Sequence, residues 1–308
     1  MENLVLVARE VAVLFALMSV GFFCRRRRIL DDAAVKGLVD LLILVVTPCL
    51  IVHVFQRDFD PSKLESLGMA FMISIAGHFL AIALSIFLVR HRSEDTRTVL
   101  RTAAVFSNAG FMGIPLEQAV LGDDGVFFGI VYVVVFNFFI WSWGLWTMGG
   151  KPRLKLMLIN PGTVGLAFGL PLFFLPARLP PVVARPVEMV AALNTPLAMI
   201  IIGYYLGGAR FDAAIRSLPV WVAAAVRLLA YPLLMLAALY PFSGHLDKTM
   251  MLAIVTASSA PVAAMVSMFA AKFNRDVDSS VAVVSGTTLL SIVTMPAVIA
   301  LAMEMLGK

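Results

Sequence analysis

The sequence predicts an all-α polytopic membrane protein in which ten transmembrane helices form two inverted five-helix repeats, with helices four and nine interrupted. Three observations predict this fold. The chain of 308 residues is 61% hydrophobic and 14% charged, with a mean hydropathy of +0.95, whereas soluble domains are about half apolar and a quarter charged. Its basic residues gather in alternate loops. Two of its apolar stretches contain residues that break helices.

Each expected helix is an apolar stretch of membrane-spanning length. A transmembrane helix needs about 20 mostly apolar residues. Ten stretches meet this requirement, and the loops between them are short: 3–23, 36–55, 67–89, 99–120, 126–147, 156–175, 186–207, 219–240, 250–271 and 279–303. Basic residues follow the first stretch rather than precede it, so we expect an anchor and not a cleavable signal.

The Lys and Arg residues orient the ten spans. Loops rich in these residues remain cytoplasmic. Of the 24 basic residues, sixteen follow odd-numbered spans and seven lie on the other side, which predicts both termini outside. The sixteen are Arg25–Arg28, Lys36, Arg90, Arg92, Arg97, Arg101, Lys151, Arg153, Lys155, Arg210, Arg216, Lys272 and Arg275. Since orientation explains the net charge of +5, no nucleic-acid partner is expected.

One basic residue, Arg227, falls inside a span, where we expect its side chain to snorkel to the inner interface. The alternative is a role in substrate binding or helix pairing. The four His and two Cys residues have no metal-ligand spacing, so we expect no metal site and no cofactor.

Two spans are unsuited to an unbroken helix. In Ser107–Leu116, Gly110 and Gly113 can adopt backbone angles that other residues avoid, and Pro115 lacks an N–H donor. A second break, Ser258–Pro261, has its proline 146 residues after Pro115. Paired interrupted spans in the two halves of a chain point to the substrate site of a transporter.

A second similarity recurs at nearly the same spacing. Thr47-Pro48 in span two and Thr195-Pro196 in span seven have prolines 148 residues apart. The two similarities together predict two halves, residues 1–150 and 151–308, with five spans each. An odd number of spans forces the halves into opposite orientations, which makes the repeat inverted.

Crossed interrupted helices create a site for an anion. The half-helices after Pro115 and Pro261 would begin near the midplane and approach it from opposite sides. The N-terminal end of a helix carries about half a positive charge and several free N–H donors. Neither break contains Lys or Arg, so backbone dipoles would hold the anion, most naturally a carboxylate.

Several motifs resemble the auxin efflux carrier family over nearly the whole chain: Asn108–Leu116, Asn194–Met199 with Gly203, Ala260-Pro261 and Ser285–Pro296. The resemblance implies the fold of bile-acid symporters and sodium/proton antiporters, elevator-like alternating access and a homodimer. It also implies an organic anion as substrate, which is auxin in plants and often malonate, malate or a similar carboxylate in bacteria. The short central link Gly149–Lys155 is similar to bacterial members, which implies a bacterial inner (plasma) membrane.

The resemblance assigns roles to residues of the first break. It implies that the Asn108 amide donates a hydrogen bond to the substrate carboxylate at the crossing. Gly110 and Gly113 would allow close approach, and Pro115 would open the outward half-helix.

The remaining candidates lie in the second repeat and in spans two and seven. Ser258, Ser259 and Pro261 hold the equivalent place in the second break, although both hydroxyl groups could instead bond to their own helix. Span seven contributes Asn194 and Thr195, and an interhelical hydrogen bond is the alternative role of Asn194. Repeat symmetry adds Thr47.

Glu117 is the acidic residue nearest to the proposed site. It could carry a proton or bind a coupling ion. We favour a place near water at the outer end of span four, beside Gly122–Gly125.

These predictions together describe a secondary carrier for a small organic carboxylate. The chain contains no GxxxxGK[ST], HExxH or GxSxG motif, so neither ATP binding nor an enzyme is expected. Two alternatives stay open: a receptor or scaffold that kept the carrier fold, and a sodium-coupled carrier similar to the bile-acid symporters. The coupling ion, proton or sodium, is open as well.

Overall fold

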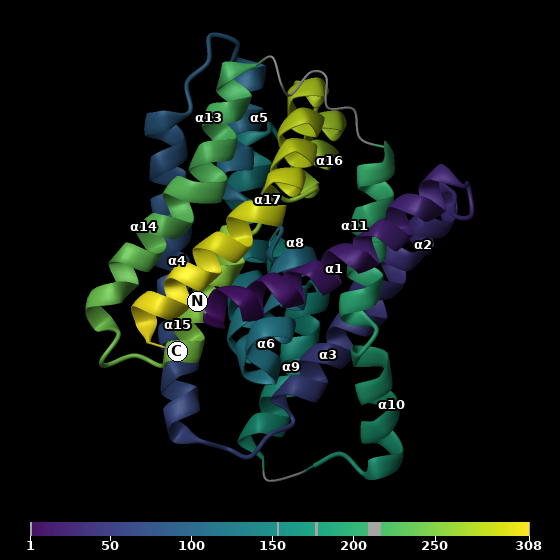
Figure 1. Ribbon diagram of the computed structural model, residues 1–308, viewed down its shortest axis with the longest axis vertical. Coiled ribbons are helices and arrows are strands. Elements are labelled where there is room, and N and C mark those ends of the chain that lie inside the picture. Colours follow the sequence, from purple (N-terminus) through teal and green to yellow (C-terminus); the bar gives the residue numbers. More distant parts are fainter. Residues whose placement is uncertain (1, 153, 176–177, 209–216, 308) are drawn as a thin grey trace.

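The computed structural model describes residues 2–152, 154–175, 178–208 and 217–307. All regular elements among them are helices, and they form one bundle (Figure 1). The turns that follow α4 and α16 lie at the top of this view, and those that follow α3 and α9 lie at the bottom. Three basic residues of the predicted inner loops, Arg153, Arg210 and Arg216, lie outside the described residues.

The helical elements have the following bounds. The α-helices are α1 (Glu2–Arg26), α2 (Asp32–Leu41), α3 (Thr47–Phe55), α4 (Pro61–Leu88), α5 (Glu94–Val105), α6 (Ile114–Phe139), α7 (Leu145–Thr147), α8 (Leu154–Leu158), α9 (Pro161–Phe174), α10 (Pro181–Ala191), α11 (Asn194–Gly208), α13 (Leu218–Ala225), α14 (Tyr231–Leu239), α15 (Lys248–Ser259), α16 (Met265–Lys272) and α17 (Val277–Leu306). Wider π-helical turns are η1 (Leu42–Val46), η2 (Ala109–Gly113), η3 (Ile140–Gly144) and η4 (Val226–Ala230), and η5 (Tyr240–Phe242) is a 3₁₀ turn.

Seven stretches of the described chain are long and apolar enough to cross a membrane: Val7–Arg26, Asp32–Phe55, Pro61–Leu88, Ala109–Thr147, Pro181–Gly208, Leu218–Phe242 and Val277–Leu306. The predicted spans 99–120, 156–175 and 250–271 are not among them as continuous helices. α9 has only 14 residues, and non-helical residues divide the other two stretches. The chain is therefore a helical, multi-pass membrane protein whose count of long helices is smaller than the sequence predicts.

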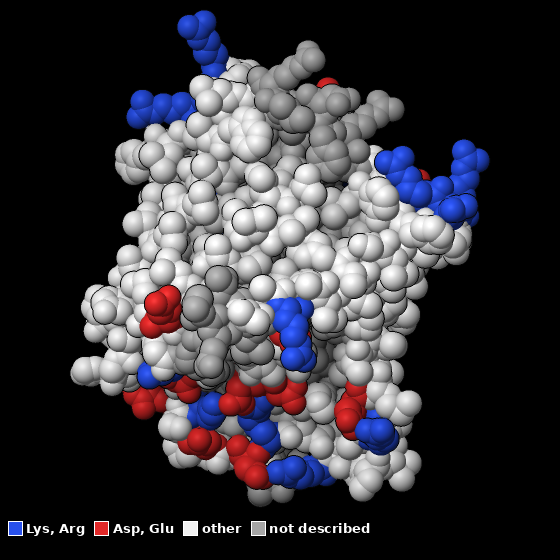
Figure 2. Space-filling view, in the orientation of Figure 1, with Lys and Arg blue, Asp and Glu red and all other residues white. Residues whose placement is uncertain are grey.

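Charged side chains are concentrated at the ends of the bundle (Figure 2). At the lower end, which we call the mixed-charge end, Lys63 lies 3.0 Å from Asp124 and 3.8 Å from Asp247, and Arg57 also pairs with Asp124. The upper corners of the view carry mainly basic residues, and the broad band between the ends holds few charges. A band without charge is what the hydrocarbon core of a bilayer requires.

Glycine brings α1 and α11 into backbone contact. A Cβ atom added at Gly21 would lie 1.9 Å from the carbonyl oxygen of Ile200, and one at Gly203 would lie 1.8 Å from that of Met18. Small residues at a helix interface are the usual means of close packing in membranes. These two helices therefore form a tightly joined pair.

After three of the π-helical turns, one residue follows and then a proline. They end before Thr47-Pro48, Ile114-Pro115 and Tyr231-Pro232. Proline lacks the N–H that an α-helix would use and clashes with the preceding turn, and a wider turn relieves both problems. At these three places the proline widens the helix instead of breaking it.

Candidate functional site at a crossing of two interrupted helices

The first interruption separates α5 from α6. α5 ends at Val105, and Phe106 is extended, with φ −97° and ψ 110°. Ser107 pairs with Val262 as an isolated antiparallel bridge, and the helix resumes with η2 at Ala109. The interruption therefore covers Phe106–Asn108.

The second interruption separates α15 from α16. α15 ends at Ser259, Ala260 is extended, with φ −62° and ψ 148°, and α16 begins at Met265. Pro261 explains this geometry, because the residue before a proline is driven out of the helical region and the proline itself has no N–H to continue the helix.

The two interruptions cross, and backbone groups of each form hydrogen bonds with the other. The Asn108 N–H donates to the Pro261 carbonyl at 2.6 Å, and the Ala263 N–H donates to the Phe106 carbonyl at 2.9 Å. The Val262 N–H donates to Oγ1 of Thr287 on α17 at 3.2 Å. Backbone groups without partners are costly in an apolar environment, so these three bonds make the interruptions tolerable inside the bundle.

Arg227 holds the carboxyl ends of α5 and α15. Its side chain is fully buried. Nη1 donates to the carbonyls of Val105 at 2.9 Å and Ala104 at 3.4 Å, and Nη2 donates to the carbonyl of Ser258. The last carbonyls of a helix carry partial negative charge, so one guanidinium neutralises both ends. The expectation that Arg227 snorkels to the interface is wrong, because the side chain is fully buried and both Nη atoms donate to carbonyls at the crossing.

The amino ends that follow the crossing begin with several amides that precede the first helical hydrogen bond. In η2 the first helical hydrogen bond runs from Met112 N–H to the Asn108 carbonyl, so the amides of Ala109, Gly110 and Phe111 precede it. In α16 the first such bond runs from Val266 N–H to the Ala263 carbonyl. First-turn amides have no partner within their helix and attract anions.

A polar cluster lies behind the crossing. The Ser107 hydroxyl lies 3.5 Å from the Tyr132 hydroxyl, which lies 3.4 Å from that of Tyr231. The Arg227 guanidinium lies 4.6 Å from the centre of the Tyr231 ring. His78 is buried beside Tyr132, with ring centres 5.1 Å apart. The members of this cluster come from α4, α6, η4 and α14 and from the first break, and the sequence does not predict that they lie together.

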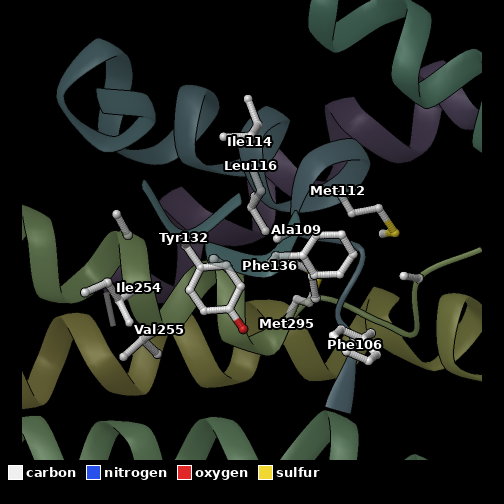
Figure 3. Packing of buried hydrophobic residues seen from close by; sticks show 14 of the residues in the cluster. Phe106, Ala109, Met112, Ile114, Leu116, Tyr132, Phe136, Ile254, Val255 and Met295 are labelled. Atoms are coloured by element: carbon white, nitrogen blue, oxygen red, sulfur yellow. The ribbon is translucent and has the colours of Figure 1, made fainter. Parts of the chain in front are cut away.

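Figure 3 shows how apolar side chains enclose the crossing. Phe106 lies at the interruption, Tyr132 and Phe136 come from α6, and Met295 comes from α17. All four are buried. This packing keeps the carboxyl ends away from water.

A cleft with an apolar lining reaches η2 from the side of α1 and α11. Ser291 is its one polar lining residue, and the others are Val11, Leu14, Phe15, Met18, Met112, Leu116, Met199 and Met295. Flexible methionine side chains can adapt to ligands of different shape. Met112 of η2 is part of the lining, so the cleft borders the turn that begins the second arm of the first interrupted helix.

The structure places the predicted residues of the first break as follows. Asn108 is half-buried at the crossing, Gly110 is exposed in η2, and Gly113 is buried against Ala257 of α15. The prediction that Pro115 opens the half-helix is wrong, because the helix resumes six residues earlier, at Ala109. The wide turn of η2 absorbs the missing donor of Pro115.

The predicted residues of the second break contribute through their backbone. The Pro261 carbonyl accepts the Asn108 N–H. The hydroxyls of Ser258 and Ser259 each donate to their own helix at 2.8 Å, to the carbonyls of Val255 and Thr256. Either hydroxyl would have to leave its helix to reach a ligand.

The candidates of spans two and seven lie farther along the bundle. Asn194 is buried at the start of α11, and its Nδ2 has no partner among the described residues. Thr195 is half-buried. The α11 residue that lines the cleft is Met199, one turn later. The Thr47 hydroxyl donates to the Leu42 carbonyl at 2.9 Å, so it serves the wide turn of η1.

Glu117 does not lie near water, and the favoured expectation is wrong. Its side chain is 0% exposed, and neither carboxyl oxygen has a hydrogen-bond partner among the described residues. At Gly122, with φ 67° and ψ −158°, the chain folds back, so that the later part of α6 covers Glu117. The Gly122–Gly125 segment signals a turn, but it does not reveal what the returning helix covers.

Comparison with known proteins yields one family. A family model described as membrane transport protein matches residues 6–157 and again residues 145–299. No curated protein matches the chain. The same model thus matches each half of the chain in turn.

Proposed function

Because the chain belongs to the auxin efflux carrier family of membrane transport proteins, we propose that it is a secondary carrier for a small organic carboxylate. The carboxylate binds where the two interrupted helices cross. Gradients or mass action drive the transport, since the sequence has no ATP-binding loop. Membership of a transport family, which is generally non-enzymatic, supports this function over catalysis.

One observation carries the proposal: the carboxyl ends and the amino ends of the helices at the crossing have different surroundings. The carboxyl ends of α5 and α15 are neutralised by Arg227. The amino ends of η2 and α16 keep the partial positive charge of their first-turn amides. A negatively charged group is the ligand that such amides favour, and the Asn108 amide beside them can donate to one carboxylate oxygen.

The two matches to one family model support two repeats of five spans. We propose that spans four and nine are the interrupted helices α5–η2–α6 and α15–α16. The wide turn before Thr47-Pro48 and the turn before Asn194 interrupt spans two and seven at matching places. Inverted halves would then place both termini outside a bacterial inner membrane.

An elevator motion would divide the bundle into two bodies. α1 with α11 and α3 with α9 would form the static body, since glycines bring each pair close together: Gly21 and Gly203 in the first, Gly165 and Gly169 in the second. α4–α6 and α13–α17 would carry the crossing. The ion pair between Arg57 and Asp124 joins the two bodies at the mixed-charge end, and it must part when they slide.

The cleft beside η2 lies between the two proposed bodies. Methionine side chains reach it from both bodies, Met18 and Met199 from one and Met112 and Met295 from the other. The family resemblance favours a short acid such as malonate or malate, and we propose that one of its carboxylates binds the η2 amides. The family resemblance supports a homodimer, which we propose together with the carrier function.

Two measurements on purified protein test the function. A thermal-shift screen against malonate, malate, acetate and indole-3-acetate, with and without sodium, identifies a bound acid. Counterflow of that acid in proteoliposomes then measures transport, with empty liposomes as the control. Exchange supports a carrier, binding without exchange supports a receptor or scaffold of this fold, and exchange that requires sodium supports a sodium-coupled carrier. If none of the four acids binds, the proposed site is contradicted.

A further inference from the structure

We propose that the Glu117 carboxyl group binds the proton that accompanies the substrate, which makes the chain a proton-coupled carrier. The inference rests on the proposed carrier function and deepens it. Glu117 is the fourth residue of α6, the half-helix whose preceding turn, η2, offers its amides to the anion. Its side chain is fully buried, and both carboxyl oxygens lack a hydrogen-bond partner among the described residues.

Glycine provides the space that this carboxyl group occupies. A Cβ atom at Gly129 would lie 1.6 Å from Oε2 of Glu117, so the carboxyl rests directly on the Gly129 backbone. A Cβ atom at Gly113 would lie 3.9 Å from Oε1 and 3.5 Å from Cα of Ala257. The carboxyl group thus lies beside η2 and the later arm of α6, where η2 packs against α15, and any side chain at position 129 would displace Glu117.

The carboxyl group must hold a proton in this conformation. An isolated carboxylate in an apolar interior is far more costly than the neutral acid. The basic side chains at the two ends of this region have other partners than Glu117. At the mixed-charge end, Arg57 and Lys63 lie over the rings of Phe127 and Phe128, at 4.5 Å and 5.3 Å from the ring centres, and both pair with Asp124. At the crossing, Arg227 is held by backbone carbonyls.

The other titratable groups on elements packed against α6 form no bond with Glu117. Those with partners of their own are Glu10 with Arg9, His53 with Asp123, His78 with the Ser74 carbonyl, Tyr132 with the Tyr231 hydroxyl, Tyr204 with Asp32, Asp247 with Lys63 and Lys248 with the Gly307 carbonyl; the remainder include Cys49, Glu65 and Lys155. The Glu117 site therefore has no fixed counter-charge.

A proton suits the pocket better than a metal ion does. A sodium or divalent ion requires several oxygen ligands. The described residues contain no group of three or more His, Cys, Asp or Glu side chains that could hold a metal. Gly113 and Gly129 lie beside the carboxyl group, and neither carboxyl oxygen has a hydrogen-bond partner among the described residues. A single proton on either oxygen removes the charge without any further ligand.

The proton and the substrate would be coupled through one rigid helix. Glu117 lies nine positions after Asn108, which is roughly 13 Å at the rise of an α-helix. Loss of the proton would place a negative charge on the same half-helix that binds the carboxylate, and the two charges would repel. We expect protonation to raise the affinity for the acid about tenfold, so that both move together.

Infrared spectroscopy tests for the proton directly. Wild-type protein at neutral pH should show the C=O stretch of a protonated carboxyl group, and Glu117→Gln should lose it. Glu65→Gln is the matched control, because Glu65 is exposed on α4. Absence of the band from the wild type, or its persistence in Glu117→Gln, would overturn the inference.

Accumulation driven by a pH gradient tests the coupling. In proteoliposomes that are acidic outside, wild type and Glu65→Gln should accumulate labelled malonate, whereas Glu117→Gln should exchange malonate without accumulating it. Gly129→Ala should uncouple transport in the same way, and Gly68→Ala, which has open space at its Cβ, should not. Wild-type exchange that ignores the pH gradient, or accumulation that follows a sodium gradient, would overturn the coupling and leave the carrier intact. If the wild type neither binds nor exchanges any acid in the panel, the proposed function fails and the coupling fails with it.

Discussion

Compared at their amino ends, the two interrupted helices differ in side-chain chemistry. The first has the polar residue Asn108 ahead of η2, whereas the second passes through Ala260–Ala264, where Pro261 and Val262 are the only larger residues. At their carboxyl ends the two helices are alike, because Arg227 donates to both. At the amino ends, therefore, the second interruption offers backbone groups alone, while the first adds the side chain of Asn108, which can select an anion.

The largest expected effect follows from removing the shared cation. Arg227→Met leaves the carbonyls of Val105 and Ser258 without their buried donor, which should lower the free energy of unfolding by about 3 kcal/mol or more. Thermal unfolding in nanodiscs measures the change. Arg185→Met, at an exposed site on α10, is the control and should cost less than about 0.5 kcal/mol. Equal stability of the two variants would contradict a common cap for both helices.

The next largest effect should appear in transport rather than in stability. Asn108→Ala removes the amide that donates to the carboxylate, so we expect at least a tenfold loss of flux, roughly 1.4 kcal/mol, with an unchanged melting temperature. Ala264→Gly, at an exposed position before α16, should change flux less than twofold. Similar losses in the two variants would remove the contrast between the repeats.

A loss of stability smaller than that of Arg227→Met should show whether Thr287 supports the second interruption. Thr287→Val removes the oxygen that accepts the Val262 N–H, and an unpaired buried donor costs about 1–3 kcal/mol. The matched variant is Thr288→Val, because the Thr288 hydroxyl donates only to the Val284 carbonyl of its own helix. Chemical unfolding of both should show a loss for Thr287→Val alone. A larger loss for Thr288→Val would mean that α17 does not support the crossing.

The smallest effects should come from the two serines of α15. Ser258→Ala and Ser259→Ala remove hydroxyls that bond only to their own helix, so flux should stay within twofold of the wild type. A tenfold loss in either variant would show that its hydroxyl turns toward the substrate. Counterflow assays beside Asn108→Ala provide the scale.

Local sequence indicated where the helices break but not what lies around the breaks. Pro261 acts on its immediate neighbours, so the second interruption follows directly from its position. The first interruption precedes the Gly110–Pro115 cluster instead, because a π-helical turn accommodates Pro115. The depth of Arg227 and Glu117 depends on contacts with helices far away in the sequence. Periodicity and charge placement do not encode such contacts.

The fold-back at Gly122 explains why the sequence does not predict the buried position of Glu117. Residues Gly122–Gly125 read as a loop in water, and the turn is real. Yet Gly129, seven residues later, brings the returning helix against the Glu117 carboxyl. A glycine in an apolar helix is common in membranes, so its role emerges only once the two arms of α6 are placed together.

A cryo-electron microscopy map of the chain in nanodiscs with bound malonate tests the central claim most directly. We expect carboxylate density within hydrogen-bond distance of the Asn108 amide and of the first amides of η2, with Arg227 still on the carbonyls of Val105 and Ser258. Density held by Arg227 itself, or helices that continue unbroken through Ser107 and Val262, would contradict it.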